Sequence, residues 1–128
     1  MKGGTMLLRQ IHPSWIQDGV ATSLAFKPAS KDKGVLSTYD GSKITPAASW
    51  SHYTSTLKLQ SSGVLGVSAD ECDGCGLVVV PDGKPYAEHV GIDFNAHGSS
   101  RQEKIAKKLR GYASIRGWLF QPDGQGPG

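Results

Sequence analysis

Long hydrophobic runs and the common motifs of nucleotide-binding and hydrolytic enzymes are missing from this sequence. No apolar run approaches the ~20 residues of a membrane-spanning helix, and the chain opens with neither a signal peptide nor a lipidation motif. We therefore expect a cytoplasmic protein without membrane contact. G-x-x-x-x-G-K-[ST] and G-x-G-x-x-G are absent, which argues against the usual nucleotide sites. The absence of G-x-S-x-G likewise argues against a Ser-His-Asp hydrolase.

Cysteine is also scarce. Cys72 and Cys75 form one C-D-G-C pair, and a zinc ribbon would need a second pair that the chain does not have. A redox C-x-x-C opens a long helix after a strand, whereas this segment is short and broken by glycine. We expect two structural or incidental thiols, no metal and no cofactor. A zinc half-site completed by a histidine and a redox role stay open as alternatives.

The composition is that of one globular domain. Of the residues, 38% are hydrophobic and 20% are charged, while Gly 17 and Pro 7 are slightly high counts that favour a turn-rich chain. We expect an α+β fold with a mainly antiparallel, twisted sheet and two principal helices packed on it. The domain is expected to span 6–121, after a flexible lead at 1–5 and before a flexible Gly/Pro tail at 122–128.

Short apolar segments between turn residues predict the strands. These segments are 7–11, 19–26, 35–39, 63–67, 77–80 and 87–94, with 118–120 as a further edge strand. Thr45-Pro46 predicts a helix start with a hydroxyl cap. Ser68 and Glu71 form the capping box of a short second helix.

The last helix, 100–116, is predicted from its caps and its periodicity. Ser100 and Glu103 have capping-box spacing, and Gly117 ends the pattern. The residues expected on its inner face are Ile105, Leu109, Tyr112 and Ala113.

The strand at 87–94 has an unusual second face. Val90, Ile92 and Phe94 alternate onto one side, which the last helix is expected to cover, and this leaves His89, Gly91 and Asp93 on the other. The glycine leaves room for something to approach the backbone. This face is either a solvated polar edge or a patch that binds a ligand.

Arg9 is the second polar residue in an apolar setting. It shares a strand face with Leu7 and Ile11, so its guanidinium needs a carboxylate, a carbonyl or a bound anion. Asp93 or Glu88 is a candidate structural partner. Capture of a phosphate or carboxylate is the functional alternative, because the planar fork suits such anions.

The motif order resembles that of a family of small bacterial proteins. The matching stretches are R-x-I-x-P at 9–13, S-x-A-F at 23–26, L-S at 36–37, an acidic-Cys step at 71–72 and H-x-x-I-D at 89–93. The resemblance implies one domain and no particular activity. It directs attention to Arg9, His12, Ser23, Ser37 and His89.

Two classes of function remain. The first is a small enzyme or nucleotide binder with Arg9, His12, His89 and Asp93 at the centre and Ser23 and Ser37 contacting the substrate. Two histidines and a cation suit metal-free phosphodiester chemistry, in which one histidine takes a proton and the other gives one. The second is a non-catalytic interaction module, such as the partner of a bacterial toxin or defence system. The other histidines, His52 and His97, are expected to be solvated.

The charge distribution adds a possible nucleic-acid partner. The net charge is +3, yet segment 101–116 holds six positive side chains and one negative, so the rest of the chain is slightly acidic. Lys104, Lys107 and Lys108 are expected on the outer arc of this helix. That arc is either a solvated face or a surface that contacts RNA or DNA phosphates.

Overall fold

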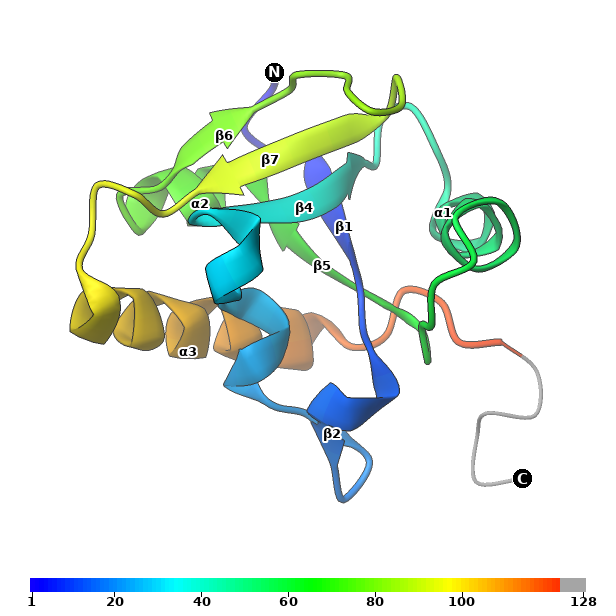
Figure 1. Ribbon diagram of the computed structural model, residues 1–128, viewed down its shortest axis with the longest axis horizontal. Helices are drawn as coiled ribbons and strands as arrows, with labels where there is room; N and C mark the ends of the chain where they lie inside the picture. Colours follow the sequence, from blue (N-terminus) through cyan, green and yellow to red (C-terminus); the bar gives the residue numbers. More distant parts are fainter. Residues whose placement is uncertain (123–128) are drawn as a thin grey trace.

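The computed structural model describes residues 1–122 and has one antiparallel sheet with a long helix across one face (Figure 1). The strand order is β5-β1-β4-β7-β6, and two short strands, β2 and β3, form a separate hairpin. The strands are β1 (Met6–Gln10), β2 (Ile16–Gln17), β3 (Val20–Ala21), β4 (Val35–Asp40), β5 (Val64–Ser68), β6 (Val78–Val80) and β7 (His89–Asp93). The predicted α+β class is confirmed.

Three α-helices and several short helical turns complete the described chain. The α-helices are α1 (Pro46–Ser51), which continues as a π-helical turn (His52–Thr56), α2 (Ala69–Gly74) and α3 (Ser99–Arg116). The 3-10 helices are Pro13–Trp15, Ser23–Phe26 and Ser30–Asp32. Both predicted caps are confirmed for α1 and α2, where Thr45 and Ser68 accept from backbone N–H groups. No helix within residues 1–122 is long and apolar enough to cross a membrane.

The main core lies between the sheet and α3. Val90, Ile92 and Phe94 are buried together with Ile105 and Leu109, so the alternation read in β7 predicted the correct face. Figure 1 shows α3 running along this side of the sheet.

The prediction that Tyr112 lies on the inner face of α3 is wrong. Tyr112 is 39% exposed, whereas Ala106 is buried. The inner face is centred between Leu109 and Ala113, and helical geometry then places Ala106 inside it and Tyr112 at its margin.

A smaller core covers part of the opposite face of the sheet. Leu8, Tyr39 and Val64 are buried there, with Trp50 and Tyr53 packed against them from α1 and its π-turn. This cover extends over β5 and β1. It leaves the β4–β7 part of this face accessible at Ser37, which is exposed.

The predicted strand at 19–26 is largely wrong. The chain forms a tight β2–β3 turn at Asp18 and Gly19, both with positive φ, and the strand ends at Ala21. A 3-10 helix at Ser23–Phe26 follows, because burying Ala25 and Phe26 against α3 requires a tight turn there. The Ala25 carbonyl of this turn accepts from Arg9 of β1 at 2.8 Å.

The ends of the domain also differ from expectation. α3 begins at Ser99 after Gly98, so Ser100 is inside the first turn, and Glu103 pairs with Lys27 at 3.0 Å rather than forming a capping box. The predicted strand at 118–120 forms only one bridge to β5, through Phe120. The lead at 1–5 bonds through its backbone to the start of α2. The predicted tail falls outside the described residues from position 123 onward.

Candidate functional site

The sheet opens between its two central strands, and Arg9 fills the opening. β1 and β4 are paired at Leu7 with Asp40 and at Leu8 with Tyr39, and the ladder ends there. One residue further, Arg9 Nη1 donates to the backbone oxygen of Ser37 at 3.0 Å. The guanidinium therefore occupies the position where a strand-to-strand bond would otherwise lie.

Two further contacts fix the orientation of Arg9. Its Nε donates to the Ala25 oxygen at 2.8 Å, and its Cζ lies 4.9 Å from the ring centroid of Trp15. The expectation that a carbonyl, carboxylate or anion holds Arg9 is confirmed, and the partners are carbonyls rather than Asp93 or Glu88. The bonds use two of the five N–H donors of a guanidinium, and the others meet no acceptor within residues 1–122.

Burial affects the charge of Arg9 only moderately. Desolvation lowers its pKa to about 10, against the opposing effect of nearby phenols and Asp32. The side chain is partly buried and still carries its charge at neutral pH. Arg9 is thus a fixed cation with donors to spare, which is the requirement for binding an anion.

Ser37, His89 and Asp82 form a continuous hydrogen-bonded line beside this cation. His89 Nε2 lies 3.1 Å from Ser37 Oγ, and His89 Nδ1 lies 2.6 Å from Asp82 Oδ1. The serine comes from β4, the histidine from β7 and the aspartate from the turn after β6. A Ser–His–Asp arrangement is therefore present, although the sequence lacks the G-x-S-x-G elbow.

The proton positions in this line follow from its acceptors. Burial acts to raise the pKa of Asp82, but the hydrogen bond and the charge of His89 outweigh it, so the pKa is lowered. An ionised carboxylate can only accept, so Nδ1 of His89 donates to it. When the ring is neutral, Nε2 is then free to accept the hydroxyl proton of Ser37.

Ser37 is accessible while its partner is not. Ser37 is exposed, whereas His89 is only 7% exposed. Its cross-strand neighbour is Gly91, which has no side chain to cover it. A Cβ built on Gly91 would approach Val35 Cγ1, so the gap beside this glycine is filled by Val35.

Aromatic rings border the site on the side of α1. Tyr86 stacks on Tyr39 with ring centroids 4.9 Å apart, and it packs edge-on against both His52 at 4.8 Å and His89 at 5.3 Å. His52 Nδ1 also lies 2.8 Å from the Tyr39 hydroxyl. The expectation that His52 is simply solvated is wrong, because the π-turn directs it onto this cluster.

The neighbouring phenols are hydrogen-bond donors at neutral pH. Burial raises the pKa of both Tyr53 and Tyr86, although the charge of Arg9 acts in the opposite direction on each. Burial likewise raises the pKa of Tyr39 strongly. The guanidinium thus has protonated phenols within its electrostatic reach.

Three predicted site residues have structural contacts of their own. His12 Nδ1 accepts from Ser14 N at 3.0 Å and so caps the helix at Pro13–Trp15, with its ring 5.8 Å from that of Trp15. Ser23 is the first residue of the 3-10 helix whose Ala25 holds Arg9. Asp93 ends β7, and its Oδ1 accepts from Asn95 N at 2.7 Å. None of them contacts the Ser37–His89–Asp82 line.

The predicted basic surface makes no hydrogen bond with Arg9, Ser37 or His89 within residues 1–122. Lys104, Lys107 and Lys108 are exposed on α3, while Arg110 Nε is bonded to the Ala21 oxygen at 2.9 Å. The surface is therefore distinct from the site at Arg9.

The cysteines belong to the core. Cys72 is fully buried and Cys75 is 6% exposed, and both are free thiols. Burial raises the pKa of Cys72 to about 12. Within residues 1–122 no three His, Cys, Asp or Glu side chains are grouped to hold a metal ion.

His97, expected to be solvated, is partly buried with Nε2 2.8 Å from the Gly76 oxygen.

Sequence reasoning missed Asp82 and the aromatic border. The sequence indicates only a turn at Pro81-Asp82-Gly83. Because β6 and β7 form a hairpin, this turn lies next to the start of β7, where His89 is. The Gly83 N–H in fact bonds to the His89 oxygen at 3.2 Å. The alternating strand at 87–94 and the turn before it were thus a signal for an acid beside His89.

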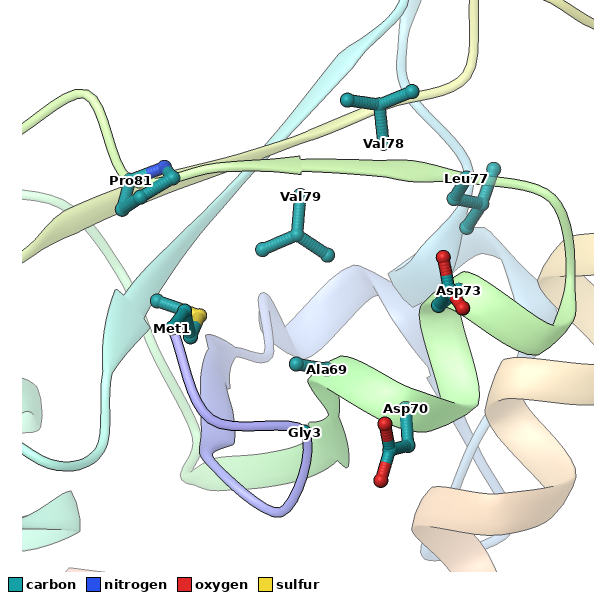
Figure 2. A pocket seen from close by; sticks show the side chains of 9 residues that line it. All are labelled: Met1, Gly3, Ala69, Asp70, Asp73, Leu77, Val78, Val79 and Pro81. Atoms are coloured by element: carbon teal, nitrogen blue, oxygen red, sulfur yellow. The ribbon is translucent and has the colours of Figure 1, made fainter.

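A separate cavity of about 470 Å³ lies between β6, α2 and the N-terminal lead (Figure 2). Its lining residues are Met1, Gly3, Ala69, Asp70, Asp73, Leu77, Val78, Val79 and Pro81. The acidic side chains in its lining are Asp70 and Asp73, the N-terminal residue Met1 also borders it, and Val79 points from β6 into the space above α2. The cavity contains none of the predicted site residues.

Comparisons with protein-family models, with curated proteins and with solved structures find no match to this chain. The functional argument therefore rests on the geometry of Arg9, Ser37, His89 and Asp82.

Proposed function

We propose that this protein is a small enzyme that acts on a phosphate-bearing substrate, with Arg9 as the anion-binding residue and His89 as the acid–base residue. The observation that carries the proposal is that Ser37 is bonded to both Arg9 and His89. The backbone of Ser37 accepts from Arg9, and its side chain bonds to His89, so the cation and the imidazole are both bonded to one exposed residue.

The guanidinium of Arg9 is the anion-binding end of the proposed site. Arg9 supplies N–H donors that no described acceptor uses, and the protonated phenols of Tyr53 and Tyr86 lie in its field. Asp32 also acts on Arg9 and opposes an anion bound there. Fixed donors of this kind stabilise the charge that develops on phosphorus-bound oxygens.

The acid–base end needs only one histidine in this geometry. His89 is oriented by Asp82 and is ready to accept a proton at Nε2, which is the role assigned to a general base. His12, the second histidine of the sequence-based hypothesis, caps a helix through Nδ1. We therefore assign both proton transfers to His89.

Hydrolysis of bis(4-nitrophenyl) phosphate and 4-nitrophenyl phosphate tests this function. We expect His89→Gln to lower kcat by about 100-fold or more, because positioned acid–base groups contribute that much. Arg9→Gln should mainly raise KM.

Two matched variants serve as controls. His97→Gln changes a histidine bonded to a backbone oxygen, and Arg110→Gln changes an arginine bonded to a backbone oxygen, and both lie away from Ser37. Turnover equal in all four variants, or none in the parent, would contradict the proposed function.

The alternative of a non-catalytic interaction module has one specific observation in its favour. β6 is an edge strand, and Val78 and Val80 on it are 56% and 39% exposed. A partner that pairs with this edge would protect the β6 amides from hydrogen exchange without affecting the Ser37 position.

A further inference from the structure

We propose that Ser37 is a covalent nucleophile, and that the phosphate ester reacts through a phosphoserine at this position. The inference rests on the proposed function, and it adds the residue that is attacked and a second chemical step. It starts from the contrast between an exposed hydroxyl and the buried imidazole that accepts its proton.

Ser37 is reached from the solvent side. Ser37 is exposed on the face of β4 that α3 does not cover, and glycine faces it across the strand pair. His89 is only 7% exposed, and its Nε2 is bonded to Ser37. A substrate at this face meets the serine first.

Activation of the hydroxyl is already arranged in the resting structure. The Ser37 Oγ to His89 Nε2 distance is 3.1 Å, which is within the range for a nucleophile and its base. Asp82 fixes the ring tautomer from the other side at 2.6 Å. A serine with a base that is itself oriented by a third group is the general signature of nucleophilic catalysis.

Charge stabilisation is provided next to the nucleophile. Arg9 Nη1 bonds to the backbone oxygen of Ser37, so the guanidinium lies beside the residue that would carry the phosphoryl group. A pentacoordinate phosphorus at Ser37 Oγ would carry negative charge on its equatorial oxygens, which Arg9 can meet with unused donors.

The reaction balances with His89 as the sole proton carrier. Ser37 Oγ attacks phosphorus, its proton moves to His89 Nε2, the bond from phosphorus to the ester oxygen breaks, and His89 returns the proton to the leaving alkoxide. Water then attacks the phosphoserine, gives one proton to His89, and releases phosphate as His89 reprotonates Ser37 Oγ. Asp82 is a positioning residue throughout, and Asp82→Asn should lower kcat with little change in KM.

The test is rapid quench of the parent protein with 4-nitrophenyl phosphate, followed by peptide mass mapping, together with labelling by a fluorophosphonate. We expect a burst of nitrophenol, one phosphoryl group on the peptide containing Ser37, and fluorophosphonate labelling at the same residue. Ser37→Ala and His89→Gln should abolish both signals, whereas Ser100→Ala, an exposed serine on α3, should match the parent.

The possible failures are distinguishable. If the parent hydrolyses the ester with the expected dependence on Arg9 and His89, but Ser37→Ala turns over as fast as Ser100→Ala, the nucleophile is wrong and the proposed function stands. If the fluorophosphonate labels Ser37 and no phosphate ester is turned over, Ser37 is a nucleophile and the phosphate function is wrong. Absence of both labelling and turnover overturns both. Thermal melts show whether each variant is folded. Labelling of the unchanged parent tests the nucleophile without any substitution.

Discussion

Arg9 has a structural role as well as a functional one. It closes the opening between β1 and β4 by donating to Ala25 and Ser37 oxygens, and it stacks on Trp15. A lysine could not reproduce this, because its single ammonium lacks the planar fork. Arg9 therefore stabilises the sheet where β1 and β4 separate, and it also places a positive charge there.

Replacing Arg9 should cost more stability than replacing an arginine with one carbonyl partner. We expect Arg9→Met to lower the free energy of unfolding by about 2 kcal/mol, because two carbonyl oxygens lose a charged donor. Arg110→Met, which removes one such bond, should cost about half as much. Urea denaturation of both variants measures the difference. A smaller loss for Arg9→Met than for Arg110→Met would show that the opening does not depend on Arg9.

At the scale of elements, the ion pair between Glu71 and Arg116 joins α2 to the end of α3. Arg116 Nη2 lies 2.9 Å from Glu71 Oε2, and its Nη1 also donates to the Gly66 oxygen at 2.8 Å. The Ser68 N–H adds a bond to Glu71 at 2.8 Å. Burial acts to raise the pKa of Glu71, but these bonds outweigh it and lower the pKa.

This pair predicts a specific acid sensitivity. Since the folded pKa of Glu71 is below its ordinary value of 4.5, its contribution is complete above that pH and is lost as the pH falls through the folded pKa. Glu71→Gln should lower neutral-pH stability by about 1–2 kcal/mol and make the acid decline shallower. Glu103→Gln, which breaks an exposed and solvent-screened pair with Lys27, should change both much less than Glu71→Gln does. Equal pH profiles for parent and Glu71→Gln would contradict this account.

The α3 surface provides the other test at this scale. If Lys104, Lys107 and Lys108 contact phosphates, changing all three to Gln should make the log–log salt dependence of RNA or DNA binding shallower by roughly 2–3. Lys2, Lys31 and Lys43, also exposed, form the matched control set. No binding by the parent at low salt removes nucleic acid as a partner of this helix.

Over the whole molecule, local sequence patterns predicted the helices and strands better than they predicted how these elements pair and pack. The alternation of β7 and the caps of α1 and α2 depend on nearby residues and are confirmed, and the α3 stripe is confirmed except at Tyr112. The end of the β1–β4 ladder at Leu8 depends on how distant segments pack, and sequence alone gives no register for it.

The site was predictable to a similar extent. Arg9, Ser37 and His89 stood out as polar residues in apolar strands or in ordered motifs, and the structure brings these three together. Asp82 and His52 did not, because a turn residue and a residue off a helical stripe acquire partners only when the chain folds. His12 was a reasonable candidate by type, but a proline after it made it a helix cap.

The central claim is that Arg9, Ser37 and His89 form one phosphate site, and NMR of the histidine and arginine side chains during titration with inorganic phosphate tests it most directly. We expect saturable shifts of the His89 ring and the Arg9 Nε–H signals. The His97 ring should stay unchanged, and Arg9→Gln should abolish the His89 shift. Phosphate that shifts His97 as much as His89, or that leaves His89 and Arg9 unchanged, would contradict the account.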